Sequence, residues 1–271
     1  MSVRVLVRPP TESFRFALSD HVERDRIDPQ RAMEQHRTFV EALRAVGVDV
    51  VSLPPKPDLP DAPFVSDAVV ALPQPGHTGG PGSLLVVARP GAESRRQEVC
   101  SVATAARELM PASAKVVEIE EPGTLEGGDV LVFGDRIAVG LSARTNREGA
   151  RQLARAAQSI GYQVFLCPIQ DRLHLATAVS VIGPSRLVGT EAGFASLVMA
   201  VSGGEIERLI VPDDELPAAN VLALGGRCFV ASGHPHAVEV LAAAPETVIE
   251  IPLDEFTKAD GGPTCLVAII R

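Results

Sequence analysis

One of the four cysteines differs from the others in its surroundings. Cys265 follows the turn-rich stretch Asp260-Gly-Gly-Pro-Thr264 and directly precedes the apolar run Leu266–Ile270, which is typical of a strand. A thiol at the edge of a strand is placed to act as a nucleophile. The other three lie inside amphipathic or apolar segments without metal-type spacing, and we expect them to be reduced and buried: Cys100, Cys167 and Cys228.

A histidine and two acids are candidates for proton transfer. His174 stands in Leu173-His-Leu-Ala-Thr177, directly before a pair of apolar runs. Glu126 and Asp129 flank two glycines, which let the backbone turn tightly before the next strand. Taken singly these patterns are weak evidence of a site, because loop histidines usually serve structure and turns favour glycine and aspartate.

Charged residues that suit a small ligand occur at similar junctions. Asp61 and Asp67 bracket a short segment whose last residue begins another pair of apolar runs. Arg89 and Arg144 each stand where such a pair ends and a helix is expected to begin. An arginine there could bind a carboxylate with two parallel hydrogen bonds beside a positive helix terminus, although a solvated loop arginine explains either residue alone.

The elements that must position these residues repeat five times along the chain. Each copy contains a polar-capped helix followed by a short strand that ends at proline or an acid. The five strands are Val48–Pro54, Lys115–Glu120, Tyr162–Pro168, Ile206–Pro212 and Thr247–Pro252. In copies two to five, paired apolar runs precede the helix, at Asp67–Arg89, Asp129–Leu141, Thr177–Gly189 and Asn220–Ser232. A unit of about 45 residues with a sheet and a helix is typical of a closed radial array.

Polar residues mark where three of the helices begin. Asp28 followed by Pro29 predicts the cap and first turn of a helix that continues through Leu43. The strings Ser94-Arg-Arg-Gln97 and Thr145-Asn-Arg-Glu148 match the capping box, in which the hydroxyl accepts from the backbone N–H three residues on. We therefore expect these two hydroxyl residues to cap the second and third helices.

The repeat also predicts where the chemistry lies. It favours an α/β protein built as a five-bladed propeller with a central opening. Asp67, Asp129, His174 and Cys265 all fall at strand boundaries, each in a different repeat. Because a radial fold brings equivalent boundaries together, we expect these side chains to share one site at the central mouth.

Composition limits the classes of partner. A chain of 271 residues, 46% of them hydrophobic, is expected to form one domain over residues 1–271. The 34 acidic residues exceed the 25 basic ones and give a net charge of −9, which argues against nucleic acid and permits a small cationic ligand.

Apolar runs fall short of the roughly 18 residues that span a membrane. The start, Met1–Leu6, is typical of a strand and unlike a secretion signal. We expect a cytoplasmic protein without membrane contact, whose oligomeric state, a homodimer included, the sequence leaves open.

Several longer strings occur in the order and at the spacing found in the dimethylarginine dimethylaminohydrolases. These strings are Leu125–Leu131, Gly140–Asn146, Leu173–Leu175 and Asp260–Cys265, with further similarity at Ala88–Arg96, Gln35–His36 and Val211–Asp214. The chain resembles this family over nearly its whole length. The resemblance implies the pentein fold, a pseudo-fivefold α/β propeller of ββαβ-type repeats.

The resemblance also implies a reaction. It is the hydrolysis of an N-substituted arginine, of the dimethylarginine or monomethylarginine type, to citrulline and an amine. Cys265 resembles the nucleophile that attacks the guanidinium carbon, and His174 resembles the general acid and base. Glu126 resembles the acid that orients the histidine and holds guanidinium nitrogens. Because these residues supply a thiolate and proton transfer to an electrophilic carbon, neither a metal nor a cofactor is expected.

The partner implied is a small guanidino amino acid, and its contacts carry over with one departure. Asp67 resembles the guanidinium-binding aspartate, Asp61 an acid near the α-amino end, and Arg89 and Arg144 the pair that binds the α-carboxylate. The remaining implied contacts lie in the loop that closes over the ligand and in the loop of the nucleophile, and they are Leu18 and Asp260.

The departure lies directly before Asp67, where the family usually has glutamate and this chain has Ser66. A serine offers one short neutral hydroxyl and leaves more room. This predicts weaker binding of dimethylarginine than in other family members, and tolerance for a bulkier or more polar substituent on the same nitrogen.

Three other functions stay open on sequence alone. Arginine deiminases carry an added helical domain and a second acid two residues after the histidine, where this chain has Ala176. Amidinotransferases share the cysteine and histidine but hand the amidino group to an amine. Ribosome-associated factors of similar fold bind without catalysis and lack the reactive set that this chain has in Cys265, His174 and Glu126.

Overall fold

The computed structural model describes residues 3–76, 82–169, 172–202 and 206–270. In these residues the strands form five separate three-stranded sheets, or blades. The first blade is β15-β1-β2 (Ala268–Ile270, Arg4–Val7, Asp49–Ser52) and the second is β3-β4-β5 (Val69–Leu72, Leu84–Val87, Lys115–Glu118). The others are β6-β7-β8 (Val130–Phe133, Arg136–Leu141, Gln163–Pro168), β9-β10-β11 (Val179–Gly183, Arg186–Gly189, Glu207–Ile210) and β12-β13-β14 (Leu222–Leu224, Arg227–Ala231, Thr247–Ile251).

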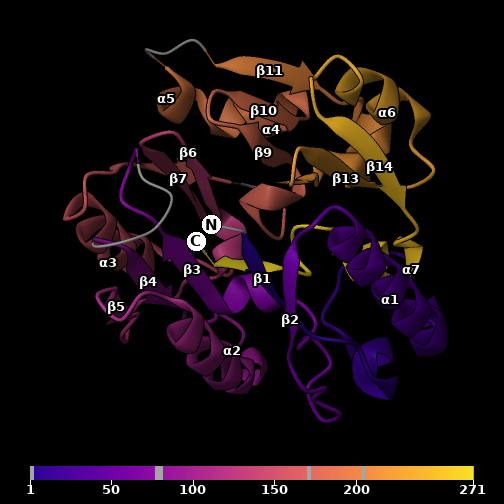
Figure 1. Cartoon of the computed structure of the whole chain (residues 1–271), viewed down its shortest axis with the longest axis horizontal. Coiled ribbons are helices and arrows are strands. Elements are labelled where there is room, and N and C mark those ends of the chain that lie inside the picture. The colour runs from indigo at the N-terminus through magenta and orange to yellow at the C-terminus, as the bar shows by residue number, and fades with distance from the viewer. Residues whose placement is uncertain (1–2, 77–81, 170–171, 203–205, 271) are drawn as a thin grey trace.

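Each blade has the same internal pattern. Its middle strand pairs antiparallel with one neighbour and parallel with the other. A parallel pair needs a crossover, and helices provide it on the outside of the ring (Figure 1). The α-helices are α1 (Pro29–Ala45), α2 (Arg96–Leu109), α3 (Arg147–Gln158), α4 (Glu191–Ser196), α5 (Val198–Val201), α6 (Pro235–Leu241) and α7 (Asp254–Thr257). Short 3-10 helices are η1 (Glu12–Phe16), η2 (Arg24–Arg26), η3 (Val65–Ala68), η4 (Glu93–Arg95), η5 (Gly127–Asp129), η6 (Leu175–Thr177) and η7 (Asp213–Ala219). The predicted pseudo-fivefold α/β propeller is confirmed.

The hydrophobic core is divided among the joints between neighbouring blades. Five clusters of buried side chains occur in the described residues, and each combines residues of two adjacent blades. In one of them Leu84 of the second blade packs with Ile137 and Leu153 of the third. A blade therefore buries its apolar surface only when its neighbours are in place, as expected for a repeat architecture.

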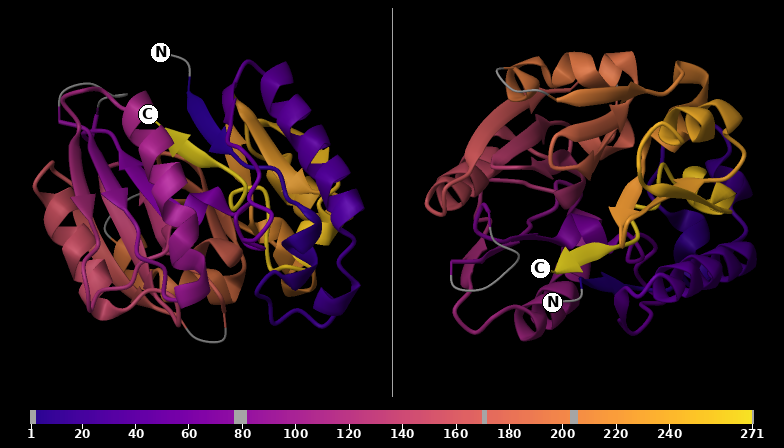
Figure 2. Two further views of the ribbon diagram at one scale, coloured as in Figure 1. Left: turned by 90° about the horizontal axis from the view of Figure 1, so that it is seen from below. Right: turned by 45° about the horizontal axis from the view of Figure 1, so that its top comes forward.

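The two ends of the chain close the ring. β1 and β15 pair antiparallel, with Arg4 opposite Ile270 and Leu6 opposite Ala268, so the first blade combines segments from both termini. Figure 2 shows these two strands side by side. The last apolar run thus supplies the strand that the first repeat lacked in the sequence.

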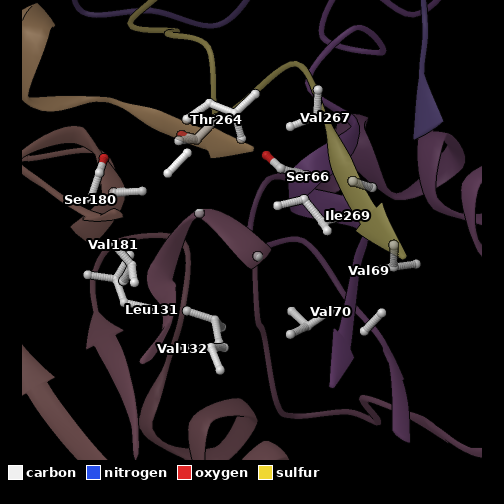
Figure 3. Close-up of a pocket in the computed structure, with 18 of the residues that line it drawn as sticks. Ser66, Val69, Val70, Leu131, Val132, Ser180, Val181, Thr264, Val267 and Ile269 are labelled. Carbon is white, nitrogen blue, oxygen red and sulfur yellow. The ribbon is translucent and has the colours of Figure 1, made fainter. Parts of the chain in front are cut away.

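A central cavity confirms the predicted opening. The innermost strands β3, β6, β9, β12 and β15 each contribute side chains to its wall. Most of these side chains are Val, Leu, Ile or Ala, and the cavity measures about 200 Å³ (Figure 3). The pocket lined by Cys265 and His174 lies beyond the ends of these strands, where the 3-10 helices η3, η5 and η6 meet.

Two of the three expected helix caps are wrong. Asp28 caps α1 as predicted, by accepting from the backbone N–H groups of Gln30 and Arg31. In α3 the cap is Asn146, one residue beyond the predicted Thr145, because its carboxamide accepts from the Gly149 N–H. The helix α2 begins after the 3-10 turn η4, with Arg95 at the cap position and without a capping side chain. A capping box fixes the start of a helix only to within a residue or two, since extra 3-10 turns are common there.

Within the described residues no helix is long and apolar enough to cross a membrane.

Candidate active site

Two glycines let the chain bring Cys265 to the lining of this pocket. The chain leaves α7 through Asp260, whose φ of 54° lies in the left-handed region, and then passes Gly261 and Gly262. A Cβ on Gly262 would lie 2.6 Å from Cγ of Asn220, so only glycine lets the two segments pack together. This packing lets Asn220 Nδ2 donate to the sulfur of Cys265 at 3.7 Å.

The thiol of Cys265 is protonated at rest. Burial raises its pKa to about 11, and the negative charge of Asp67 acts in the same direction. Hydrogen bonds from Asn220 and Thr264 favour the thiolate but do not outweigh these two effects. Ionisation of the sulfur therefore needs an added positive charge nearby, such as a cationic substrate would bring.

His174 and Glu126 form a buried pair beside this thiol. His174 Nε2 lies 2.7 Å from Glu126 Oε2, and the two residues are 5% and 0% exposed. Burial alone would lower the pKa of His174, but Asp67, Glu126 and Asp129 outweigh it and raise that pKa to about 9. At neutral pH the ring is an imidazolium, which donates from Nε2 to Glu126 and keeps a second proton on Nδ1 for transfer.

The acids Asp67 and Asp129 occupy different layers of the site. Asp67 lines the pocket, and its Oδ1 accepts from the Gly128 N–H at 2.9 Å. Burial opposes ionisation of Asp67, yet His174 and Arg95 together lower its pKa. Asp129 lies behind the pocket lining, where Oδ1 accepts from the backbone N–H that follows His174. We expected both acids to lie in the site, and only Asp67 does. Asp129 instead holds the backbone next to His174 through its hydrogen bond to Leu175.

Sequence reasoning missed a buried arginine in the middle of these acids. Arg95 is 4% exposed, and its Nη1 lies 2.8 Å from Asp67 Oδ2 and 3.3 Å from Glu126 Oε2. Its other nitrogens bind Glu98. In the sequence, the arginine pair after Ser94 is typical of an exposed helix start. The signal that it belonged to the site was present only in the resemblance, which included this string.

The two predicted carboxylate-binding arginines are placed differently. Arg144 lines the pocket, and its Nη1 lies 3.7 Å from Glu126 Oε1. Among the described residues neither of these two buried atoms has a hydrogen-bond partner. Arg89 lies outside the pocket lining, where it donates to the Gly123 carbonyl and ion-pairs with Glu121. The backbone of Arg89 bridges to Leu125, the residue before Glu126, and so remains adjacent to the site.

A loop from the N-terminal segment covers the mouth. The backbone N–H of Leu18 donates to the buried carboxylate of Asp61 at 3.0 Å, and Leu18 itself is 38% exposed. Asp260 accepts from the Ser19 hydroxyl at 2.7 Å and from the backbone N–H of Asp20 at 2.9 Å. Leu18, Asp61 and Asp260 all line the pocket, whose free volume of about 20 Å³ holds about one water molecule. A ligand larger than a water molecule therefore needs this lining to rearrange.

Ser66 does not line this pocket. Its hydroxyl donates to the backbone carbonyl of Cys265 at 3.1 Å, and its side chain belongs to the wall of the central apolar cavity (Figure 3). The wall between the two cavities also contains Gly127 and Gly128, where a Cβ would meet Ser66 and His174 respectively. The space beside the short side chain of Ser66 therefore belongs to the central cavity and not to the pocket of Cys265.

One group in the described residues has the spacing of metal ligands. Atoms of Asp67, Glu126 and His174 lie within 4.8 Å of one another. Both carboxylates already ion-pair with Arg95, and the histidine is held as a cation. A metal ion would have to compete with these two positive charges. The three residues therefore suit the binding of a guanidinium group better than the binding of a metal ion.

The remaining cysteines divide between core and surface. Cys167 and Cys228 are buried as predicted, and burial raises the pKa of each to about 11. Cys100 is exposed, which corrects the expectation that it is buried. It lies on α2, whose buried face is formed by Val99, Val102 and Ala103, so a one-residue offset turns its side chain to solvent. All four thiols are free.

The chain is similar in sequence to known proteins of one family. The sequence model of the family described as "N,N dimethylarginine dimethylhydrolase, eukaryotic" matches residues 11–189. The N(G),N(G)-dimethylarginine dimethylaminohydrolase of Streptomyces coelicolor is 36% identical, covering 100% of this chain and 98% of that protein. The protein of the same name from Pseudomonas aeruginosa is 32% identical, with 98% of both chains covered.

Solved structures extend the similarity to the fold. A variant of the Pseudomonas aeruginosa enzyme in complex with citrulline superposes with a TM-score of 0.86, at 30% identity and over 99% of both chains. The fold likeness also reaches the N-terminal domain of the cyanobacterial arginine dihydrolase ArgZ, with a TM-score of 0.82 at 20% identity. Together with the sequence matches, this likeness shows that the chain belongs to the dimethylarginine dimethylaminohydrolase family, a family of hydrolases that cleave C–N bonds of amidines.

Proposed function

We propose that this protein hydrolyses an N-methylated arginine to citrulline and an amine through a covalent bond to Cys265. The observation that carries the proposal is the convergence of a nucleophile, a proton donor and buried carboxylates in one pocket, from Cys265, His174, Asp67 and the Glu126 behind them. The citrulline in the structure of the Pseudomonas aeruginosa relative supports the product. The substrate class, a small guanidino amino acid, follows from the same relatives.

In this proposal the guanidinium of the substrate lies among the carboxylates. Asp67 faces the pocket and is kept ionised, while Glu126 Oε1 is a buried acceptor without a hydrogen-bond donor in the described residues. Two N–H groups of a guanidinium would satisfy acceptors of this kind with charge-assisted hydrogen bonds. Arg144 and Asp61 also line the pocket, and Asp61 accepts from the backbone N–H of Leu18, so we assign these two residues to the α-carboxylate and the α-amino group.

The first half of the reaction forms the covalent intermediate. The cationic substrate stabilises the thiolate of Cys265, whose proton goes to solvent, and the sulfur attacks the guanidinium carbon. His174 then gives its Nδ1 proton to the nitrogen of the departing amine as the C–N bond breaks. The products of this step are a neutral amine and a cationic S-alkylthiouronium on Cys265.

The second half releases citrulline. The now neutral His174 takes a proton from a water molecule, and the resulting hydroxide attacks the same carbon. The C–S bond breaks and the sulfur leaves as a thiolate, while the hydroxyl group loses its remaining proton to solvent and becomes the C=O of the ureido group. Solvent then reprotonates the thiolate. His174 ends protonated again, which matches the pKa of about 9 that its neighbours impose.

Product analysis tests the reaction. The protein would be incubated separately with arginine, monomethylarginine, dimethylarginine and a mixture containing an acceptor amine, and both the ureido product and the released amine would be measured. We expect citrulline with methylamine or dimethylamine. Ammonia released from arginine as the main reaction would indicate a deiminase, and a new guanidino compound without citrulline would indicate amidino transfer.

Two variants test the assigned roles. We expect Cys265→Ser and His174→Ala each to lower turnover by several decades, with the fold intact by circular dichroism. Effects of residues that act as a unit are not additive, so the double variant should be no worse than the single ones. The Cys100→Ser variant is the matched control, because this exposed thiol lies outside the pocket and should keep full activity. Near-normal turnover in Cys265→Ser would remove the nucleophile assignment.

A further inference from the structure

Asn220 joins three segments around the reacting sulfur, although it does not line the pocket itself. It is 4% exposed and lies between η7 and β12. Its carboxamide contacts Thr264 and Cys265 on the loop that leads into β15, and Ala176 in the turn η6 that leads into β9. One side chain thus connects the innermost parts of three blades, at the thiol and two residues beyond His174.

Two backbone groups fix which way this carboxamide points. The N–H of Thr264 can only donate, and it lies 3.0 Å from Oδ1 of Asn220. The carbonyl of Ala176 can only accept, and it lies 3.2 Å from Nδ2. The second proton of Nδ2 is therefore available to the sulfur of Cys265, at 3.7 Å. An aspartate of the same shape would keep the bond from Thr264 and lose both donated bonds.

The bond from Nδ2 to the sulfur depends on the charge of the sulfur. A hydrogen bond to an ionised partner is about twice as strong as one between neutral groups, so this contact favours the thiolate over the thiol. Burial and the charge of Asp67 raise the pKa of Cys265, and Asn220 acts against both.

Asn220 brings this effect without adding a charge to a crowded site. The ionisable groups that line the pocket around the sulfur are Asp61, Asp67, Arg95, Arg144, His174 and Asp260, with Glu126 bound to the histidine. A neutral donor stabilises the thiolate but leaves the charge balance of these groups unchanged. A lysine or arginine in its place would repel the cationic substrate of the proposed function.

We propose that Asn220 is a further catalytic residue, whose Nδ2 stabilises the sulfur of Cys265 as a thiolate before it attacks and again when it leaves. The second role rests on the proposed function, in which the C–S bond breaks with the sulfur as the leaving group. In the covalent intermediate the sulfur carries no negative charge, so the bond from Asn220 is weakest there. Asn220 therefore favours the two thiolate states over the intermediate between them.

The first test needs no substrate. In a Cys100→Ser background, alkylation of Cys265 by iodoacetamide at pH 9 would be followed by mass spectrometry for Asn220→Ala and Asn220→Asp. Asn220→Ala removes the donor and should slow alkylation about fivefold, because the higher nucleophilicity of the less stable thiolate offsets part of the loss. Asn220→Asp also adds a negative charge beside the sulfur, so its rate should fall by about tenfold or more.

A merely structural Asn220 would change this rate in the opposite direction, since looser packing exposes the thiol to the reagent. The matched control is Asn146→Asp, which makes the same chemical change at the cap of α3, where aspartate caps as well as asparagine. It should be alkylated at the wild-type rate. An unchanged or faster rate in folded Asn220→Ala would overturn the proposal, and this variant decides alone if Asn220→Asp does not fold.

Steady-state kinetics provides the readout that depends on the proposed function. For a methylated arginine, Asn220→Ala should lower kcat about tenfold and change KM less than about twofold, because Asn220 does not line the pocket. A raised KM with unchanged kcat would instead mean that the carboxamide only shapes the pocket, and would refute the catalytic role. If the wild type fails to turn over any methylated arginine while Asn220→Ala still slows alkylation, the proposed function fails and the stabilisation of the thiolate by Asn220 stands.

Discussion

At the scale of single residues, the resting protonation state differs from that of the cysteine and histidine pair of papain, in which the pKa of the cysteine is strongly lowered and the sulfur is a thiolate. At neutral pH the Cys265 thiol is neutral, because burial and then the negative charge of Asp67 raise its pKa, and the His174 ring is charged, because Asp67 and the other nearby acids raise its pKa. A thiolate would be repelled by that charge, whereas an incoming guanidinium neutralises it. Under the proposed function, the substrate would therefore activate the thiol that attacks it, and the thiol would react slowly with other electrophiles in the absence of substrate.

This arrangement predicts a pH dependence of alkylation. In a Cys100→Ser background, the rate at which iodoacetamide modifies Cys265 should rise with pH toward a midpoint near 11, because only the thiolate reacts. Replacing Asp67 with Asn removes a charge that opposes thiolate formation, so the midpoint should move to lower pH. Mass spectrometry of the modified protein follows both. A wild-type midpoint at or below 9.0, the ordinary thiol value, would contradict the assignment.

The two predicted carboxylate-binding arginines should separate by experiment. If Arg144 binds the α-carboxylate, Arg144→Ala should lower kcat/KM for a methylated arginine by about one to two decades, the effect of losing a charge-assisted bond. An analogue without the carboxylate, such as N-methylated agmatine, should lose far less. Arg89→Ala should have the smaller effect, because Arg89 is already paired with Glu121 and Gly123 outside the pocket. Equal losses for both substrates would make Arg144 a structural residue.

The place of Ser66 changes the expectation drawn from the sequence. A carboxylate introduced by Ser66→Glu would enter the central apolar cavity behind the wall of Gly127 and Gly128. It would not reach the pocket of Cys265. We therefore expect Ser66→Glu to leave the ranking of arginine, monomethylarginine and dimethylarginine unchanged, measured as relative kcat/KM. A selective fall in KM for the methylated arginines would instead show that position 66 contacts the ligand.

Residue identities could be read from the sequence more readily than their partners. The grouping of Cys265, His174 and Asp67 in one pocket was predictable because each stands at a strand boundary of a different repeat. Arg95 was not, because a helix start explains an arginine equally well and its three acidic partners lie 3 to 31 positions away. Long-range pairing of this kind depends on the closed ring, which local patterns do not encode.

At the scale of elements, the start of α3 shows how one helix end serves both stability and the site. Asn146 caps the helix, and its predicted rival Thr145 is fully buried, where its hydroxyl accepts from the Glu126 N–H at 3.1 Å. The sequence correctly indicated hydrogen-bonding side chains at this helix start, but Asn146 caps the helix and Thr145 binds Glu126. Because the helix begins one residue later than predicted, the hydroxyl of Thr145 is free to bind the backbone of Glu126.

This division predicts opposite outcomes for two adjacent substitutions. Asn146→Ala should lower the free energy of unfolding by about 1 kcal/mol, the usual effect of losing a cap, with activity unchanged. Thr145→Val keeps the shape but removes the acceptor for Glu126, so kcat should fall while the cap stays intact. Chemical denaturation and steady-state kinetics distinguish them. Loss of activity in Asn146→Ala with full activity in Thr145→Val would reverse the assignment.

At the scale of the whole molecule, the repeat was predictable and the closure was not. Five helix and strand patterns, four of them preceded by paired apolar runs, indicated the number of blades and the order of elements, since each depends on local periodicity. The sequence did not say that β15 would complete the first blade by pairing with β1, because this contact joins the two ends of the chain. That pairing also fixes Cys265, three residues before β15, against the rest of the site.

The shared cores predict that the ring unfolds as one unit. Ile270 on β15 packs in the joint between the first and second blades, and Leu187 on β10 packs in the joint between the third and fourth. Both are buried, so Ile270→Ala and Leu187→Ala should each lower the free energy of unfolding by about 2–5 kcal/mol. Because neighbouring blades hold each other in place, either substitution should reduce hydrogen-exchange protection in all five blades by the same amount, measured by mass spectrometry. Loss confined to the substituted joint would show that the blades open independently, and the prediction of a single cooperative domain over residues 1–271 would fail with it.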